Sequence, residues 1–276
     1  MMGFGKNFGI LLFVVVMFLG LFTLGCTLPG SPTEGEQKQD TKKGGVTGSL
    51  GIFISDVRFD SRIEEGSSID LSLEVSNGGE FDAKNVKIYL DGLSNRWNPP
   101  TPIERNVGNI NRGDYSTVEF STTSPVVGIN VSYSFKIRVE YDYEATYFGV
   151  FEVKRDGTKV NSTIKNQMKS NTPIVFNLLD QKYESATNSL RLKFDVVNRE
   201  KARNGNVIGS ISIRTEDMTC DTTSITFRET DSSKTLNCYV NLPSNFDSFY
   251  PQVKLKASYR YTYSTQEYKV NVYTPE

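Results

Sequence analysis

Apolar and polar residues alternate along much of the chain after residue 50. In the stretches 69–76 and 135–142 every second side chain is apolar, and the residues between are Asp, Ser, Glu, Lys or Arg. This period of two predicts strands that bury one face. The same pattern predicts further strands at 52–57, 86–90, 115–122 and 147–153, the last of them after a turn near Glu144-Ala145.

Turn-forming residues separate these runs. Asn77-Gly78-Gly79 tolerates positive φ, and three prolines interrupt the stretch 99–102. About seven short strands in roughly 100 residues, without helical periodicity, predict a sandwich of two antiparallel sheets. Tyr (14 residues) and Phe (17) are abundant, as expected of an all-β protein.

The second half of the chain repeats the first. Three pairs of segments align at similar spacing: Leu71–Asn77 with Leu192–Asn198, Asn85-Val86 with Asn206-Val207, and Lys136–Tyr143 with Lys254–Tyr261. A shared Asn after a strand and a shared Tyr-x-Tyr favour duplication, although any two alternating strands resemble each other to some degree. The sequence therefore predicts two tandem sandwich domains.

Composition sets the predicted boundaries. They are an apolar N-terminal segment at 1–26, a flexible linker at 27–49, a first sandwich domain at 50–154, a connector at 155–172 and a second sandwich domain at 173–276. The linker has too few apolar residues to offset the entropy lost on ordering. The connector is polar and rich in turn residues, and a short helix at 163–169 is an alternative for part of it.

One stretch of the first domain resembles a known family. Residues 73–90 read Leu-Glu-Val-Ser-Asn-Gly-Gly-Glu-Phe-Asp-Ala-Lys-Asn-Val-Lys-Ile-Tyr-Leu. This run resembles the core of the CARDB-type adhesion domain and of related Ig-like repeats in surface-layer proteins. The resemblance implies an Ig-like sandwich, an extracellular location and an adhesive or structural role. The second domain departs from it, because 199–205 replaces the Gly-Gly loop.

An uncharged apolar run begins at Phe8 and, continued to Leu28, is long enough to cross a bilayer as a helix. Lys6 before the run favours an orientation that puts the rest of the chain outside the cytoplasm. The ending Thr23-Leu24-Gly25-Cys26 resembles a lipoprotein signal, although Thr23 departs from the usual Leu. The resemblance implies cleavage and lipidation at Cys26. The alternative is a helix that is kept as an anchor.

Cys220 and Cys238 remain as a pair in a chain predicted to be exported. Such pairs usually bond in oxidising compartments, so a disulfide is predicted, with two buried free thiols as the alternative. The chain has three cysteines, no histidine and a net charge of −1. Missing histidine removes His-based catalysis and most zinc sites, and the weak net charge argues against nucleic-acid binding. We expect no enzyme activity, no metal and no cofactor.

Three residues are candidate contact or modification sites. Trp97 lies in a proline-rich stretch, where it could be presented to a partner or could fold back over the sandwich edge. Asn130 and Asn161 each begin a sequon for glycosylation. Oxygen-bearing side chains between 77 and 85 could hold calcium, and a solvated turn is the alternative.

The leading hypothesis is a binding or structural protein of the cell envelope, anchored to the membrane through residues 8–28 or through lipid on Cys26. It would act in adhesion or envelope assembly, with surface proteins or glycans as partners. The runner-up is a subunit of a surface filament or secretion apparatus assembled through the N-terminal helix. The third hypothesis is an exported hydrolase that uses carboxylates.

Overall fold

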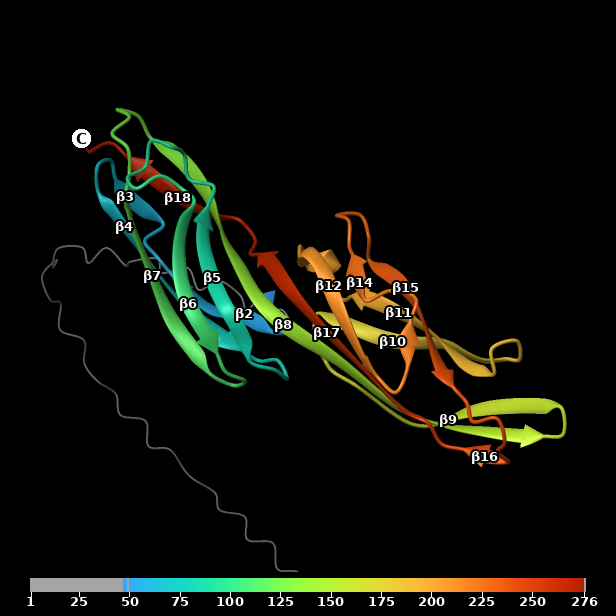
Figure 1. Ribbon diagram of the computed structural model, residues 1–276. Coiled ribbons are helices and arrows are strands. Elements are labelled where there is room, and N and C mark those ends of the chain that lie inside the picture. Colours follow the sequence, from blue (N-terminus) through green and yellow to red (C-terminus); the bar gives the residue numbers. More distant parts are fainter. Residues whose placement is uncertain (1–46, 49, 276) are drawn as a thin grey trace, which may run out of the picture. The chain divides into compact units, whose positions relative to one another are not determined.

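A computed structural model of the chain describes residues 47–48 and 50–275 (Figure 1). The predicted apolar segment and nearly all of the predicted linker lie outside the described residues. Within the described part the chain forms strands and one 3-10 helix, η1 (Lys201–Arg203), and no α-helix. The prediction of an all-β protein is therefore confirmed. No helix in this part has the length and apolar character needed to span a bilayer.

The described strands form three sheets. One four-stranded sheet has the order β1 (Thr47–Gly48), β2 (Ile52–Arg58), β4 (Ser68–Asn77), β7 (Tyr115–Thr123). A second has the order β10 (Ile174–Glu184), β11 (Ser189–Asn198), β15 (Ser233–Asn241), β13 (Thr219–Cys220). The ten-stranded sheet contains the path β14 (Ser224–Thr226), β12 (Asn206–Glu216), β17 (Gln252–Ser264), β8 (Val131–Asp156), β18 (Tyr268–Tyr273), β3 (Arg62–Glu64), and in addition β5 (Ala83–Asp91), β6 (Ile103–Ile110), β9 (Lys159–Lys169) and β16 (Ser248–Phe249).

The core lies between the large sheet and the two smaller ones. Alternate residues of β4 and β11 are buried, as their period of two requires. In the second half, Tyr147 of β8 packs edge-on against Phe194 of β11, with ring centres 4.9 Å apart. In the first half, Phe135 of β8 meets Phe59, just after β2, at 5.1 Å. The sheets thus pack face to face, as in a β-sandwich.

Strand β8 runs without interruption through 26 residues. The turn predicted near Glu144-Ala145 is wrong, because these two residues pair with Ser258 and Ala257 of β17. Neither is Gly, Pro or Asn, and the buried side chain of Ala145 continues the alternation of its strand. One strand therefore serves both halves of the protein.

The segment predicted as a connector also forms a strand. β9 pairs with the end of β8 in a hairpin, so the helix proposed for 163–169 is wrong. Val160 and Ile164 are partly buried against the core while their neighbours are exposed. That spacing is compatible with a period of two, and the ladder with β8 supplies the backbone hydrogen bonds that the segment needs.

The C-terminal strand returns to the first half. After β17 the chain forms β18, which pairs with β8 and, in parallel, with β3 (Figure 1). The side chains of Tyr268, Val270 and Val272 are buried there. β8 extends into the second half and the C-terminal strand completes the first, and both halves belong to one compact unit.

Candidate functional site

Equivalent residues of the two repeats lie opposite each other where β8 pairs with β17. The repeats align Asp142 with Arg260, and these two residues are direct partners in the ladder. On either side of this pair, Tyr141 faces Tyr261 and Tyr143 faces Tyr259. The junction therefore has a local pseudo-two-fold axis through the Asp142–Arg260 pair.

The four tyrosines lie on the buried face of the junction. Their ring centres are 5.5 to 6.4 Å apart in four edge-to-face contacts, the geometry that aromatic quadrupoles favour. Burial raises the pKa of Tyr143, and of Tyr259 and Tyr261 more strongly. These rings hold the two repeats at a fixed register.

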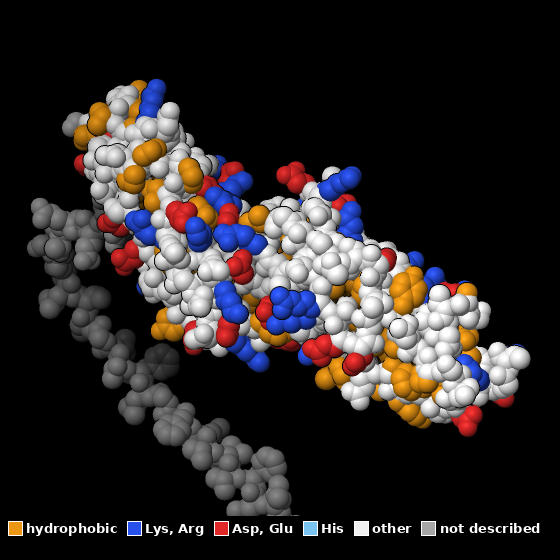
Figure 2. Space-filling view, in the orientation of Figure 1, with side chains coloured by type: hydrophobic (Ala, Val, Ile, Leu, Met, Phe, Trp, Pro, Cys, Tyr) orange, Lys and Arg blue, Asp and Glu red, His pale blue; other side chains and the backbone are white. Residues whose placement is uncertain are grey.

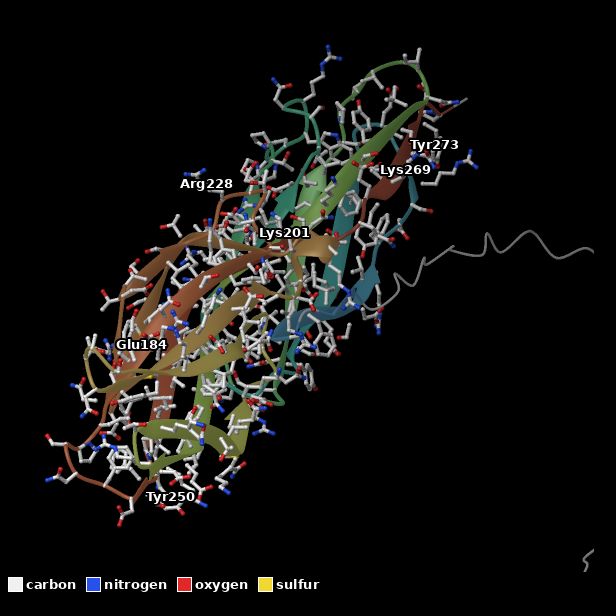
Figure 3. The ribbon with its side chains drawn as sticks, turned by 90° about the vertical axis from the view of Figure 1, so that its right-hand side faces the viewer. Glu184, Lys201, Arg228, Tyr250, Lys269 and Tyr273 are labelled. Carbon is white, nitrogen blue, oxygen red and sulfur yellow. A yellow bond between two sulfur atoms is a disulfide. The ribbon has the colours of Figure 1, made fainter. Side chains whose placement is uncertain are left out.

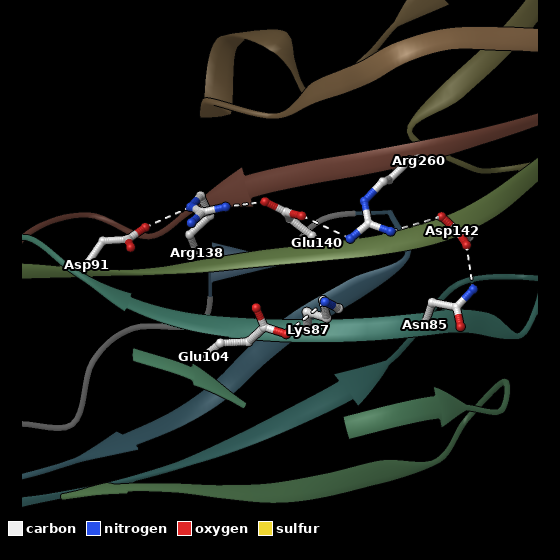
Figure 4. A network of polar contacts seen from close by, with 8 residues as sticks. All are labelled: Asn85, Lys87, Asp91, Glu104, Arg138, Glu140, Asp142 and Arg260. Carbon is white, nitrogen blue, oxygen red and sulfur yellow. Dashed lines mark hydrogen bonds and ion pairs between the residues drawn. The ribbon is translucent and has the colours of Figure 1, made fainter. Parts of the chain in front are cut away.

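The opposite, partly exposed face of β8 and β17 carries, together with Asp91 of β5, a row of alternating charges, here called the charged strip (Asp91, Arg138, Glu140, Asp142 and Arg260; Figure 4). Arg138 donates to Asp91 at 2.7 Å and also contacts Glu140. Arg260 lies 3.0 Å from Glu140 and 3.6 Å from Asp142. Positive and negative side chains are interspersed over β5 and β8 in Figure 2.

Neighbouring strands extend the charged strip. Asn85 of β5 donates to Asp142 at 2.7 Å, and the Arg138 guanidinium lies 4.0 Å from the centre of the Tyr89 ring. Lys87 pairs with Glu104 at 2.7 Å, and this hydrogen bond lowers the pKa of the Glu104 carboxyl. The result is a preorganised polar surface whose charges already have partners.

A cleft of about 400 Å³ adjoins the charged strip where the two repeats meet. Its lining comes from both repeats: Asp82, Lys84, Asp142, Tyr143, Glu144, Ile208, Ser210, Ser258, Tyr259 and Arg260. A site of this size with mixed hydrogen-bonding groups suits a polar ligand or a partner's side chains.

A second polar cluster surrounds Glu152 on β8. Its carboxylate accepts from Lys165 at 2.8 Å, from the Tyr250 hydroxyl at 2.7 Å and from Lys154 at 3.1 Å. The hydrogen bond from Lys165 is the main cause that lowers the pKa of Glu152 to about 2. Tyr250, labelled in Figure 3, joins the segment between β16 and β17 to the β8–β9 hairpin, so this cluster is a structural link.

Trp97 is buried, with 1% of the residue exposed. Its indole packs edge-on against Tyr133 at 5.4 Å. The hypothesis that Trp97 presents an aromatic surface to a partner is therefore wrong. Folding back over the sandwich, the alternative, is the arrangement in the structure, because the ring gains apolar contacts there.

The other predicted site residues lie apart from the charged strip. Cys220 and Cys238 are opposite each other on β13 and β15 and form a disulfide. Asn130 and Asn161 are exposed, the first in a loop and the second on β9. Cys26 lies outside the described residues.

The loop considered for calcium has a structural role at its first residue. Asn77 is buried, and its amide donates to the carbonyls of Phe81 and Ile110 at 2.8 and 2.9 Å. Its side-chain oxygen accepts from the Gly79 N–H at 3.1 Å. In the described part of the chain, no group of three or more His, Cys, Asp and Glu residues is arranged to hold a metal ion.

The sequence contains one local signal for the charged strip. Arg138, Glu140 and Asp142 occupy successive polar positions on the partly exposed face of a strand, which puts them in one row. Their partner Arg260 comes from a distant strand. Only the register of β8 against β17 brings it to them.

Neither a protein-family model nor a curated protein matches this sequence. Among solved structures, a secreted serine protease, VesC from Vibrio cholerae, matches at 12% identity over 80% of this chain and 51% of that chain. This chain thus spans about half the length of the protease. The TM-score is 0.24, and we draw no functional inference from it.

Proposed function

We propose that the chain is a membrane-anchored protein whose two tandem Ig-like sandwich domains lie outside the cytoplasm and act in adhesion or envelope assembly. The Cys220–Cys238 disulfide carries this proposal, because paired cysteines usually bond in exported proteins. The apolar run at 8–28 provides a route to that compartment. The charged strip and its cleft offer a polar surface for a surface protein or a glycan.

Protease treatment of intact cells tests the location. The predicted linker at 27–49 has almost no apolar residues to protect it. Protease added outside intact cells should release a soluble fragment that contains both sandwich domains. A chain that is cut only after the cells are permeabilised would contradict the proposal. A cytoplasmic protein in the same cells is the control for cell integrity.

Lipid labelling tests how the chain is anchored. If Cys26 is lipidated, a labelled lipid precursor should enter the native chain and be absent from Cys26→Ser. The neighbouring variant Thr27→Ser is the matched control and should keep the label. A membrane-bound chain that takes up no label would favour the retained helix, whose apolar length suffices for anchoring.

Photo-crosslinking tests the binding surface. A photoreactive amino acid at Ser210, which lines the cleft, should capture a partner on intact cells. The same probe at Ser121, exposed on β7 of another sheet, is the matched control. Capture at Ser121 and not at Ser210 would reject the cleft as the contact surface. Ladders made only of this chain would favour the filament subunit instead.

A further inference from the structure

The exposed faces of β8 and β17 differ in charge although the strands are equivalent in the repeats. After Arg138, β8 carries Glu140, Asp142 and Glu144 at successive, partly exposed positions of one face, here called the acidic row. β17 carries Lys256 and Arg260, here called the basic row. The two rows face each other across the ladder, and three ion pairs join them.

These ion pairs connect the rows directly. Arg260 contacts both Glu140 and Asp142, at 3.0 and 3.6 Å, and Lys256 contacts Glu144 at 2.8 Å. All five side chains are partly exposed, so each pair stabilises the fold only weakly. Weak pairs in a regular row are better suited to selecting a partner strand than to stabilising it.

A second copy of β8 could in principle take the place of β17. In the register of the junction, Asp142 would then face Asp142 of the second copy, and Glu140 would face its Glu144. On the buried face Tyr141 would meet Tyr143, as tyrosine meets tyrosine in the native pair. The buried face therefore accepts either partner, and only the exposed face discriminates between them.

The order of synthesis makes this discrimination useful. β8 ends at Asp156 and β17 begins at Gln252. The edge of β8 that pairs with β17 therefore has no partner strand until the second half has been synthesised. An unpaired edge with an apolar face is a template for pairing with another chain. Like charges directly opposite each other oppose such pairing.

We propose that the acidic row prevents β8 from pairing with β8 of a second copy, and so directs it to β17 of its own chain. The acidic row is in this view a device against self-association, and the basic row provides its complement. This inference concerns assembly of the chain and is independent of the proposed function.

Refolding of the full chain in a mild detergent tests this proposal. One variant neutralises the acidic row (Glu140→Gln, Asp142→Asn, Glu144→Gln), and its matched control neutralises the basic row (Lys256→Gln, Arg260→Gln). Both lose the ion pairs between the strands. After dilution from denaturant without reductant, light scattering should show a doubled mass for the acidic-row variant, increasing with concentration. The basic-row variant and the native chain should have the same mass.

Cysteine crosslinking tests the register. Only residue 142 lies opposite itself in a symmetric β8–β8 pair, so Asp142→Cys with Glu140→Gln, Glu144→Gln and Cys26→Ser should form disulfide-linked dimers. The control is Thr146→Cys combined with Glu140→Gln, Asp142→Asn, Glu144→Gln and Cys26→Ser. It should not crosslink, because residue 146 would lie opposite residue 138 in the same pair. A monomeric acidic-row variant at all concentrations, equal dimerisation of both charge variants, or crosslinking at 146 and not at 142 would overturn the proposal.

Discussion

Each repeat ends a strand, β4 or β11, at a buried asparagine. Asn77 donates from its side chain to the Ile110 carbonyl at 2.9 Å, and Asn198 donates to the Gly205 carbonyl at 3.1 Å. In both loops the asparagine oxygen accepts the backbone N–H two residues later. The loop that follows each of these strands is here called a corner. The asparagine hydrogen bonds satisfy backbone groups that the corner would otherwise bury without partners, which gives a reason for both repeats to have an asparagine there.

The two corners differ in what surrounds this asparagine. In the second, the Tyr261 hydroxyl donates to the Asn198 oxygen at 2.8 Å, whereas in the first the equivalent Tyr143 hydroxyl accepts from the Phe81 N–H at 3.2 Å. The second corner also buries an acid, Glu200, with 5% of the residue exposed. The comparison indicates that the asparagine contacts are common to both repeats while the loop chemistry differs.

The largest expected effect comes from adding a side-chain carbon to the glycines that lie against the tyrosine hydroxyls. A Cβ at Gly79 would overlap the Tyr143 hydroxyl and lie 2.8 Å from the Leu50 carbonyl oxygen, and one at Gly205 would overlap the Tyr261 hydroxyl. Gly79→Ala and Gly205→Ala should each lower the free energy of unfolding by about 2–3 kcal/mol, measured by denaturant titration. Partial rescue by Phe in place of the tyrosine would identify the hydroxyl as the cause.

Gly78→Ala is the matched control for the first corner. The three atoms nearest to a Cβ there all belong to the Phe53 ring, which can move, so the cost of Gly78→Ala should be clearly smaller. If Gly79→Ala were as mild as Gly78→Ala, the inferred close approach of Gly79 to the Tyr143 hydroxyl would be contradicted.

The second largest effect distinguishes the hydrogen bonds of the Tyr261 and Tyr143 hydroxyls. Tyr261→Phe removes a buried hydrogen bond to Asn198 and should cost about 1–2 kcal/mol. Tyr143→Phe leaves only the partly buried Phe81 N–H without this partner and should cost less. Denaturant titration of both variants measures the difference. Equal costs would show that the corners are energetically alike despite their different bonds.

The sequence predicted these corners better than it predicted the junction. The Asn and Tyr-x-Tyr matches are local patterns, and alternation assigns most strands. The pairing of Asp142 with Arg260 depends on contacts between distant segments, which a local pattern does not contain. The turn predicted near Glu144-Ala145 is wrong although the alternation continues through both residues, and their pairing with β17 keeps the chain extended.

High pH should weaken both corners, and the second more strongly. Burial raises the pKa of Tyr143 and raises that of Tyr261 further, above the value of about 10 in the unfolded chain. The stability that each provides is complete below pH 10 and is lost as pH rises toward the folded pKa. For Tyr261 the loss at pH 11 should be about 1 kcal/mol.

Thermal unfolding between pH 8 and pH 11 measures this loss. The Tm of Tyr261→Phe should decrease less steeply with pH than that of the native chain, and Tyr143→Phe should lie between them. A native slope retained in Tyr261→Phe would mean that other buried tyrosines dominate the alkaline transition, such as Tyr259, whose pKa burial raises well above 10.

The smallest effect concerns the acid that only the second corner buries. Burial raises the pKa of Glu200, although Arg203 at 3.6 Å acts in the opposite direction. A raised folded pKa means that the contribution of Glu200 is complete below its unfolded pKa and is lost as pH rises through the folded value. Glu200→Gln should therefore raise Tm by about 1–3 °C at pH 7 and have less effect at pH 4.

Glu80→Gln, at an exposed acid of the first corner, is the matched control and should change Tm at neither pH. A lower Tm for Glu200→Gln at pH 7 would show that the ion pair with Arg203 outweighs the cost of burying the charge.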